Sequence, residues 1–223
     1  MEPLRVRDRV LDFLFPPFCV SCAQRGEWWC RRCREMVDMP QTDSDPSKEL
    51  DGIVVTGYYH DPSLRAAIHG LKYAGITEMR SCLDAYLRHW LAVRGSPFPW
   101  FRETEIALQR VPASPERVRF RGFDQSEYLL ELFSYVVFPE AIHLDIIGRR
   151  KGSGLTQASI KDDALREANA TQSFFLKDGV WIPSIVILVD DVVTTGSTMG
   201  EAARVLRAAG VAHVYGFALA VGA

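Results

Sequence analysis

A stretch of carboxylate, hydroxyl and glycine residues near the C-terminus has the composition of a site for a phosphorylated sugar. In chain order, its members are Asp190, Asp191, Val192, Val193, Thr194, Thr195, Gly196, Ser197 and Thr198. Hydroxyl groups can donate hydrogen bonds to phosphate oxygens, and a glycine lets the backbone approach a phosphate closely. Carboxylates do not bind phosphate, but they accept hydrogen bonds from the vicinal hydroxyls of a ribose. The stretch therefore predicts a ribose 5-phosphate site in which Asp190 and Asp191 are the candidate catalytic residues.

The same residues could serve structure alone, because carboxylates cap turns and hydroxyls cap helices. Capping requires one such residue, whereas this stretch carries two carboxylates and four hydroxyls. The excess favours a ligand site.

Two clusters of cysteines near the N-terminus have the spacing of a metal site. Cys19 and Cys22 form one CxxC pair, and Cys30 and Cys33 form a second pair after seven intervening residues. Two such turns can complete a tetrahedral zinc site, and four thiolates leave no open position for catalysis. We expect structural Zn²⁺, with redox-active pairs and disulfides as the alternatives. Cys82 stands apart within a helical pattern and is expected to be a buried core thiol.

The residues around the phosphate stretch predict how it is positioned. Residues 185–189 are continuously apolar, as in a central parallel strand that is covered on both faces. A helix is expected at 198–209, and a helix N-terminus offers backbone N–H groups and the positive end of a dipole to a phosphate. Ligands of open α/β sheets bind at the carboxyl ends of the strands, which is where this turn would lie.

The remaining chain alternates between strand and helix patterns, which predicts an α/β fold with a parallel sheet flanked by helices. Strands are expected at 53–59, 106–111, 142–147, 173–176 and 211–220, and helices at 5–15, 62–72, 77–93 and 125–137. Residues 41–51 are rich in turn formers and predict a linker. We therefore expect a zinc module at 1–40, the linker at 41–51 and an α/β domain at 52–223.

The composition is that of an ordinary globular protein, with 48% hydrophobic and 24% charged residues. No run of about 18 apolar residues occurs, and the first residues mix charges with apolar side chains, unlike a secretory signal. We expect a cytoplasmic protein without membrane insertion. The formal net charge of −2 predicts no polyanion-binding character for the molecule as a whole.

Several motifs in a fixed order resemble the ComF (GntX-like) family, competence-associated proteins with a type I phosphoribosyltransferase domain behind a small zinc module. Besides the cysteine pairs and the phosphate stretch, the motifs are 71–73 (LKY), 111–112 (VP), 121–125 (RGFDQ), 156–157 (TQ), Arg166, Asn169 and Phe174. The resemblance spans nearly the whole chain. One departure is Asp124, where the family usually has Asn, so a contact that needs an amide donor there is in doubt.

This resemblance implies that the ligand is phosphoribosyl pyrophosphate (PRPP), bound together with Mg²⁺. It implies a pyrophosphate loop at 112–114, directly after the expected strand at 106–111, and a mobile loop at 149–157. The further PRPP-binding residues that it implies are Pro112, Ala113, Ser114, Arg121, Arg150 and Gln157. Cations suit a pyrophosphate leaving group, although exposed arginines are also common on solvated surfaces.

Two functions remain open at this point. One is a phosphoribosyltransferase, for which no acceptor and no general base stand out in the sequence. The other is a non-catalytic PRPP-responsive module that binds single-stranded DNA or a protein. The resemblance implies competence, or else nucleotide-linked metabolism, as the setting, and a competence ATPase or helicase as a partner. Trp28 and Trp29 lie among arginines and could stack on bases, or they could pack the small module instead.

Overall fold

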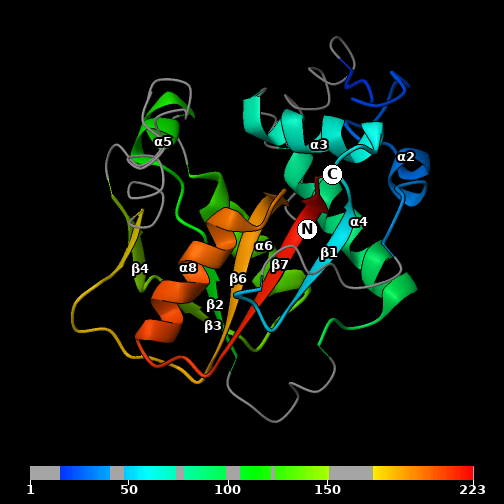
Figure 1. Ribbon diagram of the computed structural model, residues 1–223. Coiled ribbons are helices and arrows are strands. Elements are labelled where there is room, and N and C mark those ends of the chain that lie inside the picture. The colour runs from blue at the N-terminus through cyan, green and yellow to red at the C-terminus, as the bar shows by residue number, and fades with distance from the viewer. Residues whose placement is uncertain are drawn as a thin grey trace.

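Five parallel strands form the central sheet of the described residues, in the order β1-β7-β6-β2-β3. The computed structural model describes residues 16–40, 48–73, 78–98, 106–121, 124–150 and 173–222. The strands are β1 (Gly52–Tyr58), β2 (Ile106–Arg110), β3 (Ile142–Leu144), β6 (Ile185–Val193) and β7 (His213–Val221). Because all pairings in this sheet are parallel, the carboxyl ends of the strands lie at one edge (Figure 1).

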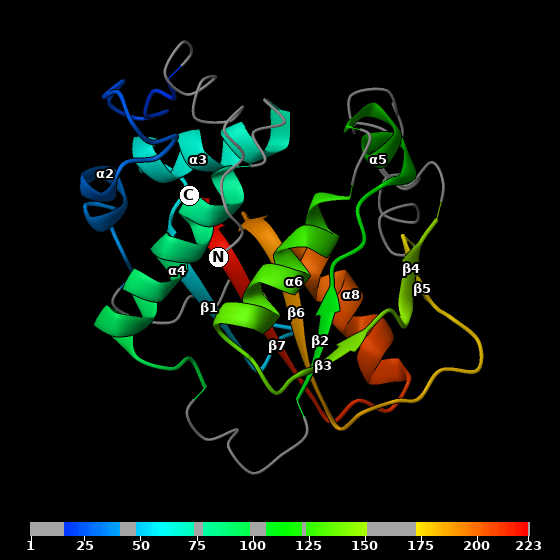
Figure 2. The same cartoon turned by 180° about the vertical axis from the view of Figure 1, so that it is seen from behind.

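Helices cover both faces of this sheet. The helices of the described residues are α3 (Pro62–Tyr73), α4 (Met79–Arg94), α5 (Pro115–Arg121), α6 (Gln125–Val136) and α8 (Ser197–Ala208), and the short α2 (Arg31–Glu35) belongs to the cysteine region. Helix α8 lies on one face, and α4 and α6 lie on the other (Figures 1 and 2). The fold is thus the expected α/β arrangement of a parallel sheet between helices. None of the helices in the described ranges combines the length and apolarity needed to cross a bilayer.

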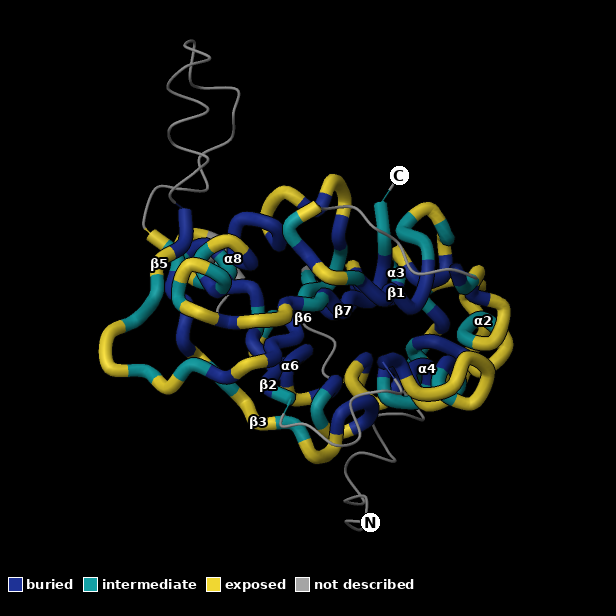
Figure 3. The backbone as a smooth tube through the Cα atoms, turned by 60° about the horizontal axis from the view of Figure 1, so that its bottom comes forward, coloured by how far each residue is buried: buried dark blue, intermediate teal, exposed yellow. Residues whose placement is uncertain are grey.

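Strand β6 is buried on both faces, as its continuous apolar sequence predicts. Ile187 and Val189 point into the cluster under α4 and α6, and Val186 and Leu188 point into the cluster under α8. In Figure 3 the strands β6 and β7 form the buried centre of the molecule, and the helices around them expose only their outer sides. Since β6 pairs with β2 and β7 along its length, its position is fixed from both sides.

Strand β7 carries a large and a small residue that set the packing of the two faces. Phe217 meets Phe133, Phe138 and Trp90 edge to face, with ring centroids 4.7, 5.4 and 5.8 Å away. On the other face a Cβ at Gly216 would lie only 2.6 Å from the sulfur of Met199, so the glycine lets the start of α8 sit close to the sheet. Aromatic anchors and one glycine therefore fix the helices that border the carboxyl edge.

The expected strand at 142–147 is wrong in its extent. It divides into β3 and β4 (Ile147–Arg149), and β4 pairs antiparallel with β5 (Phe174–Leu176) in a separate two-stranded sheet. The side chain of Gln109 accepts a hydrogen bond from the backbone N–H of Ile146 at 2.8 Å, in place of a ladder partner from β2. The parallel pairing therefore ends at Leu144, and the chain turns away.

Two further differences affect the carboxyl edge. Helix α5 occupies residues that the strand and helix patterns left unassigned, and β6 extends to Val193, beyond the predicted end at residue 189. Asp190 and Asp191 are therefore still in the strand, because Asp190 and Val192 pair with Ala218 and Ala220. The expected helix at 5–15 and most of the expected linker at 41–51 lie outside the described residues.

Replacing Phe217 by alanine should destabilise the fold by about 3–5 kcal/mol, because three aromatic contacts are lost and a cavity remains. The matched control is Tyr135→Ala, since the Tyr135 side chain is 72% exposed and should cost less than about 1 kcal/mol. Urea unfolding of both variants measures the difference. Equal costs for the two variants would contradict the assignment of Phe217 to the core centre.

Candidate functional site

A pocket of about 420 Å³ opens at the carboxyl edge of the sheet. This volume is within the range of small-molecule sites, roughly 300–1,000 Å³. It is lined by Tyr59, Lys72, Val111, Pro112, Ala113, Ser126, Arg149, Asp190, Asp191, Val192, Val193, Thr194, Gly196, Ser197, Thr198 and Met199. These residues come from the ends of β1, β2, β4 and β6, from α3 and α6, and from the start of α8.

The end of β6 brings two carboxylates into the pocket. The backbone N–H of Asp191 donates to Oδ1 of Asp190 at 2.8 Å, and the backbone N–H of Val192 donates to Oδ1 of Asp191 at 2.7 Å. Lys72, at the end of α3, forms an ion pair with Asp191, and both side chains are less than one-fifth exposed. The two carboxylates are therefore held in place by local backbone bonds and by a cation from a distant element.

The environment of Asp190 favours its protonated form. Burial and the neighbouring carboxylate of Asp191 raise the pKa of Asp190 to about 8, although Lys72 and the N–H of Asp191 oppose the shift. At neutral pH the charged groups that line the pocket are then Asp191, Lys72 and Arg149. Their sum is one positive charge, so the pocket suits an anionic ligand despite its two aspartates.

The turn after β6 has the geometry of a phosphate cradle. Gly196 has a positive φ of 70° and directly precedes α8, a conformation that favours glycine. Thr195 donates its hydroxyl to the hydroxyl of Ser197 at 3.0 Å, while Thr194, Ser197 and Thr198 border the pocket. The first N–H groups of any helix lack intrahelical partners. The start of α8 can therefore offer N–H groups and hydroxyls together to an anion.

The loop after β2 forms the opposite wall. Pro112 and Ala113 line the pocket, and the backbone N–H of Val111 donates to the carbonyl of Val189 at 2.9 Å. Arg149 reaches this loop from β4, with a guanidinium nitrogen 3.5 Å from the carbonyl oxygen of Pro112 and the guanidinium carbon 5.2 Å from the ring centroid of Phe174. The two-stranded sheet of β4 and β5 thus places the guanidinium group of Arg149 beside the pocket.

Asp124, where the ComF family usually has Asn, accepts a hydrogen bond through its side chain. Its carboxylate caps α6 by accepting from the backbone N–H of Ser126 at 2.9 Å, and it forms an ion pair with Arg110 at the end of β2. Ser126 lines the pocket. These contacts require no amide donor at residue 124, so the substitution fits the local structure.

The structure brings most of the sequence-predicted site residues together, but not all of them. Among the described residues, Ser114 is buried and Arg150 is exposed, and neither lines the pocket; Thr195 is also exposed and outside the lining, and its hydroxyl contacts that of Ser197. The side chain of Arg121 and the whole of Gln157 lie outside the described residues. Sequence reasoning missed Tyr59, Lys72 and Ser126 as lining residues. Two signals could have indicated them: Tyr59 stands at the end of a predicted strand, and Lys72 lies in the LKY motif at 71–73.

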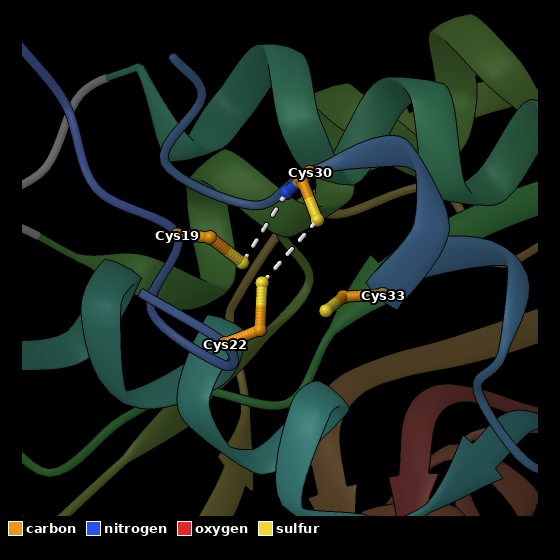
Figure 4. A group of neighbouring side chains, drawn as sticks. All are labelled: Cys19, Cys22, Cys30 and Cys33. Atoms are coloured by element: carbon orange, nitrogen blue, oxygen red, sulfur yellow. Dashed lines mark hydrogen bonds between the residues drawn. The ribbon is translucent and has the colours of Figure 1, made fainter. Parts of the chain in front are cut away.

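The four cysteines of the two CxxC pairs converge on one point (Figure 4). Their sulfur atoms all lie within 4.8 Å of one another, and those of Cys22 and Cys30 are 3.7 Å apart. A tetrahedral zinc with Zn–S bonds of ~2.3 Å would separate its sulfurs by about 3.8 Å. The four cysteines are thus positioned to bind a metal ion.

Backbone groups prepare one of these sulfurs for a metal. Burial would raise the pKa of the Cys19 thiol, but the backbone N–H groups of Cys30, Cys22 and Ser21 outweigh burial and lower it to about 6. The thiolate is the form that binds metals. The donor set therefore fits a thiolate-bound ion.

Trp29 connects this module to the sheet domain. Its side chain is fully buried, donates from Nε1 to the Ser63 hydroxyl at 2.7 Å and packs on Tyr86 with ring centroids 5.2 Å apart. Trp29 is therefore a packing residue and is not available to stack on bases. Arg31 and Arg34 form ion pairs with Glu35 and Glu27, which reduces the positive charge that the module offers.

Two competence proteins are similar to this chain in sequence. Competence protein ComFC of Streptococcus pneumoniae is 33% identical over 109 residues, which are 49% of this chain and 45% of that protein. Competence protein F of Haemophilus influenzae is 29% identical over 209 residues, which are 92% of this chain and 84% of that protein. Both similarities agree with the resemblance of this chain to the ComF family. No family model matches the chain. The alignment with the pneumococcal relative spans less than half of that protein, so only the second comparison extends over most of both chains.

The Asp190 carboxyl should titrate near pH 8 in a ¹³C NMR experiment. The folded-state pKa lies above the unfolded value of about 3.9, so the folded chain holds the proton while the unfolded chain releases it. The free energy of unfolding should therefore fall as pH rises between about 4 and 8, and Asp190→Asn should flatten this dependence.

Lys72→Met serves as the control for the same titration. The charge of Lys72 lowers the pKa of Asp190, so its removal should move the midpoint upward. A wild-type spectrum without a carboxyl that titrates between about pH 6 and 9, or one in which that signal persists in Asp190→Asn, would contradict this description of the site.

Proposed function

We propose that this protein binds PRPP in the pocket at the carboxyl edge of the sheet and acts as a phosphoribosyltransferase. The observation that carries the proposal is the convergence of two carboxylates and a phosphate-type turn on one pocket. Asp190 and Asp191 lie near the end of β6, and the segment at 194–198 joins β6 to α8 and includes the first residues of that helix. Phosphate groups bind at helix N-termini, and ribose hydroxyls pair with carboxylates.

The opposite wall supports a site for the diphosphate of PRPP. Pro112 and Ala113 lie in the loop after the neighbouring strand β2, and Arg149 lies beside them. Arginine is well suited to diphosphate oxygens because its donors are fixed in a fork. Mg²⁺ bound together with PRPP would neutralise further charge on the diphosphate. Catalysis would then come from positioning and from stabilising the departing pyrophosphate.

The cysteine module is proposed to hold a structural Zn²⁺. Four thiolates saturate a tetrahedral ion, so this metal would have no open position for a substrate. The contact of Trp29 with Ser63 and Tyr86 supports a role in stabilising the module against α3 and α4. We further propose a role in competence, on the basis of the names of the two relatives.

A second candidate function is a PRPP-responsive module that binds single-stranded DNA without turnover. It is favoured by the exposed ring of Phe18 and by the exposed Arg25 and Arg32 on the cysteine module. Aromatic rings among cations bind single strands by stacking and by charge attraction. PRPP binding without pyrophosphate release, together with a change in DNA affinity, would favour this second function.

The variant Asp190→Asn/Asp191→Asn should lower the affinity for PRPP and Mg²⁺ at least about 100-fold. It removes the charged acceptor of Asp191 and the carboxyl of Asp190 from the ribose hydroxyls; a hydrogen bond to a charged group contributes about 1.5–3 kcal/mol and one to a neutral group about 0.5–1.5 kcal/mol. Calorimetric titration measures the affinity, and Asp178→Asn is the matched control because Asp178 is exposed in the turn before β6. Unchanged PRPP affinity in the double variant would overturn the proposed site.

The variant Cys30→Ser/Cys33→Ser should lose the bound metal, from about one zinc per chain to almost none, and should make residues 16–40 sensitive to proteolysis. Cys82→Ala is the control, since Cys82 is buried among core residues and should leave the zinc content unchanged. Atomic emission measures the zinc. Purified wild-type protein without stoichiometric zinc would contradict this assignment.

A further inference from the structure

A hydrogen-bonded tyrosine and histidine border the pocket and have no part in the binding roles proposed above. Tyr59 directly follows β1, and its backbone N–H donates to the carbonyl of Val221 at the end of β7. Its hydroxyl oxygen lies 2.9 Å from Nε2 of His69 on α3. The tyrosine is half-buried and lines the pocket, whereas the histidine is exposed. The pair therefore connects the pocket to solvent.

The pair lies on the side of the pocket away from the loop at Pro112. Tyr59 follows β1 and leads into α3, while Pro112 follows β2 and leads into α5, and β7 and β6 separate β1 from β2. Helices α3 and α5 accordingly stand on opposite sides of the carboxyl edge (Figures 1 and 2). His69 and Lys72 are three residues apart on α3 and so share a face of the helix, and Lys72 reaches Asp191.

Displacement at a sugar carbon with inversion requires the nucleophile and the leaving group to lie on opposite faces of the ring. If the diphosphate lies beside Pro112 and Arg149, the acceptor must approach from the side of β1. We propose that Tyr59 and His69 form the acceptor side of the site and take the proton from an acceptor that attacks through an N–H or O–H group. This inference rests on the proposed transferase function.

The step balances without a further reactant. The lone pair of the acceptor forms the new bond to C1′ of the ribose, and the bond from C1′ to the diphosphate oxygen breaks with its electron pair on the diphosphate. The proton of the acceptor passes to the Tyr59 oxygen as the Tyr59 proton passes to Nε2 of His69, in the tautomer that carries its ring proton on Nδ1. The exposed imidazolium then releases its proton to water. Tyr59 is the catalytic residue in this step, and His69 is a positioning and relay residue behind it.

The test measures PRPP affinity and pyrophosphate release separately in Tyr59→Phe and His69→Gln. The probes are PRPP with Mg²⁺ and, in turn, water alone, ammonium, adenine, hypoxanthine and uracil as acceptors. PRPP affinity should stay within about twofold of wild type, and kcat should fall by about 10²–10⁴-fold, the range of general acid–base catalysis. The matched controls are Tyr58→Phe and His60→Gln, a neighbouring stacked pair with ring centroids 5.1 Å apart that should leave both quantities unchanged.

Each outcome decides between the inference and the function beneath it. A loss of PRPP affinity in Tyr59→Phe or His69→Gln would overturn the inference, because the pair would then belong to the PRPP contacts. Unchanged kcat in both variants would overturn it as well, and so would wild-type protein that binds PRPP but releases pyrophosphate with none of these acceptors. Wild-type protein that does not bind PRPP at all would overturn the proposed function itself.

Discussion

The pairing of β6 with a parallel strand on each side is the constraint on which the pocket depends. Because β2 and β7 fix β6 along its length, the strand can carry Asp190 and Asp191 to the carboxyl edge as part of a regular ladder. The same edge receives the loop at Pro112 from β2 and Tyr59 from β1. These three parts of the pocket wall therefore extend strands of the sheet, and their positions follow from strand register.

Charge balance is the second constraint, because two adjacent carboxylates oppose the binding of an anion. Two interactions reduce the negative charge of this pair. Burial keeps a proton on Asp190, whose pKa is raised to about 8, and Lys72 forms an ion pair with Asp191. Arg149 then leaves a positive excess at the wall beside Pro112. Ribose hydroxyls need acceptors and a diphosphate needs cations; the pocket offers acceptors at the end of β6 and the guanidinium of Arg149 at the wall beside Pro112.

The parts of this site that local sequence determines were predictable, and the parts that depend on distant contacts were not. A continuously apolar strand, two aspartates and a glycine-containing turn lie within one short segment, so residues 185–198 predicted both a strand–turn–helix unit and the type of ligand it could bind. The spacing of the cysteines likewise predicted that they converge on one metal position. Lys72 meets Asp191 only because α3 ends above β6, and no pattern around residue 72 indicates that partner. The division of the strand expected at 142–147 depends on the side chain of Gln109, and the burial of Trp29 depends on Ser63 and Tyr86. Each of these contacts joins residues that are far apart in the chain.

The most direct test of the central claim is a crystal structure of the protein with PRPP and Mg²⁺. The account predicts the 5-phosphate on the turn at 194–198, the ribose hydroxyls on Asp190 and Asp191, and the diphosphate beside Pro112 and Arg149. Tyr59 should then face C1′ from the side away from the diphosphate. A ligand bound in the reverse orientation, with its diphosphate on the turn before α8, or bound outside this pocket, would contradict the account.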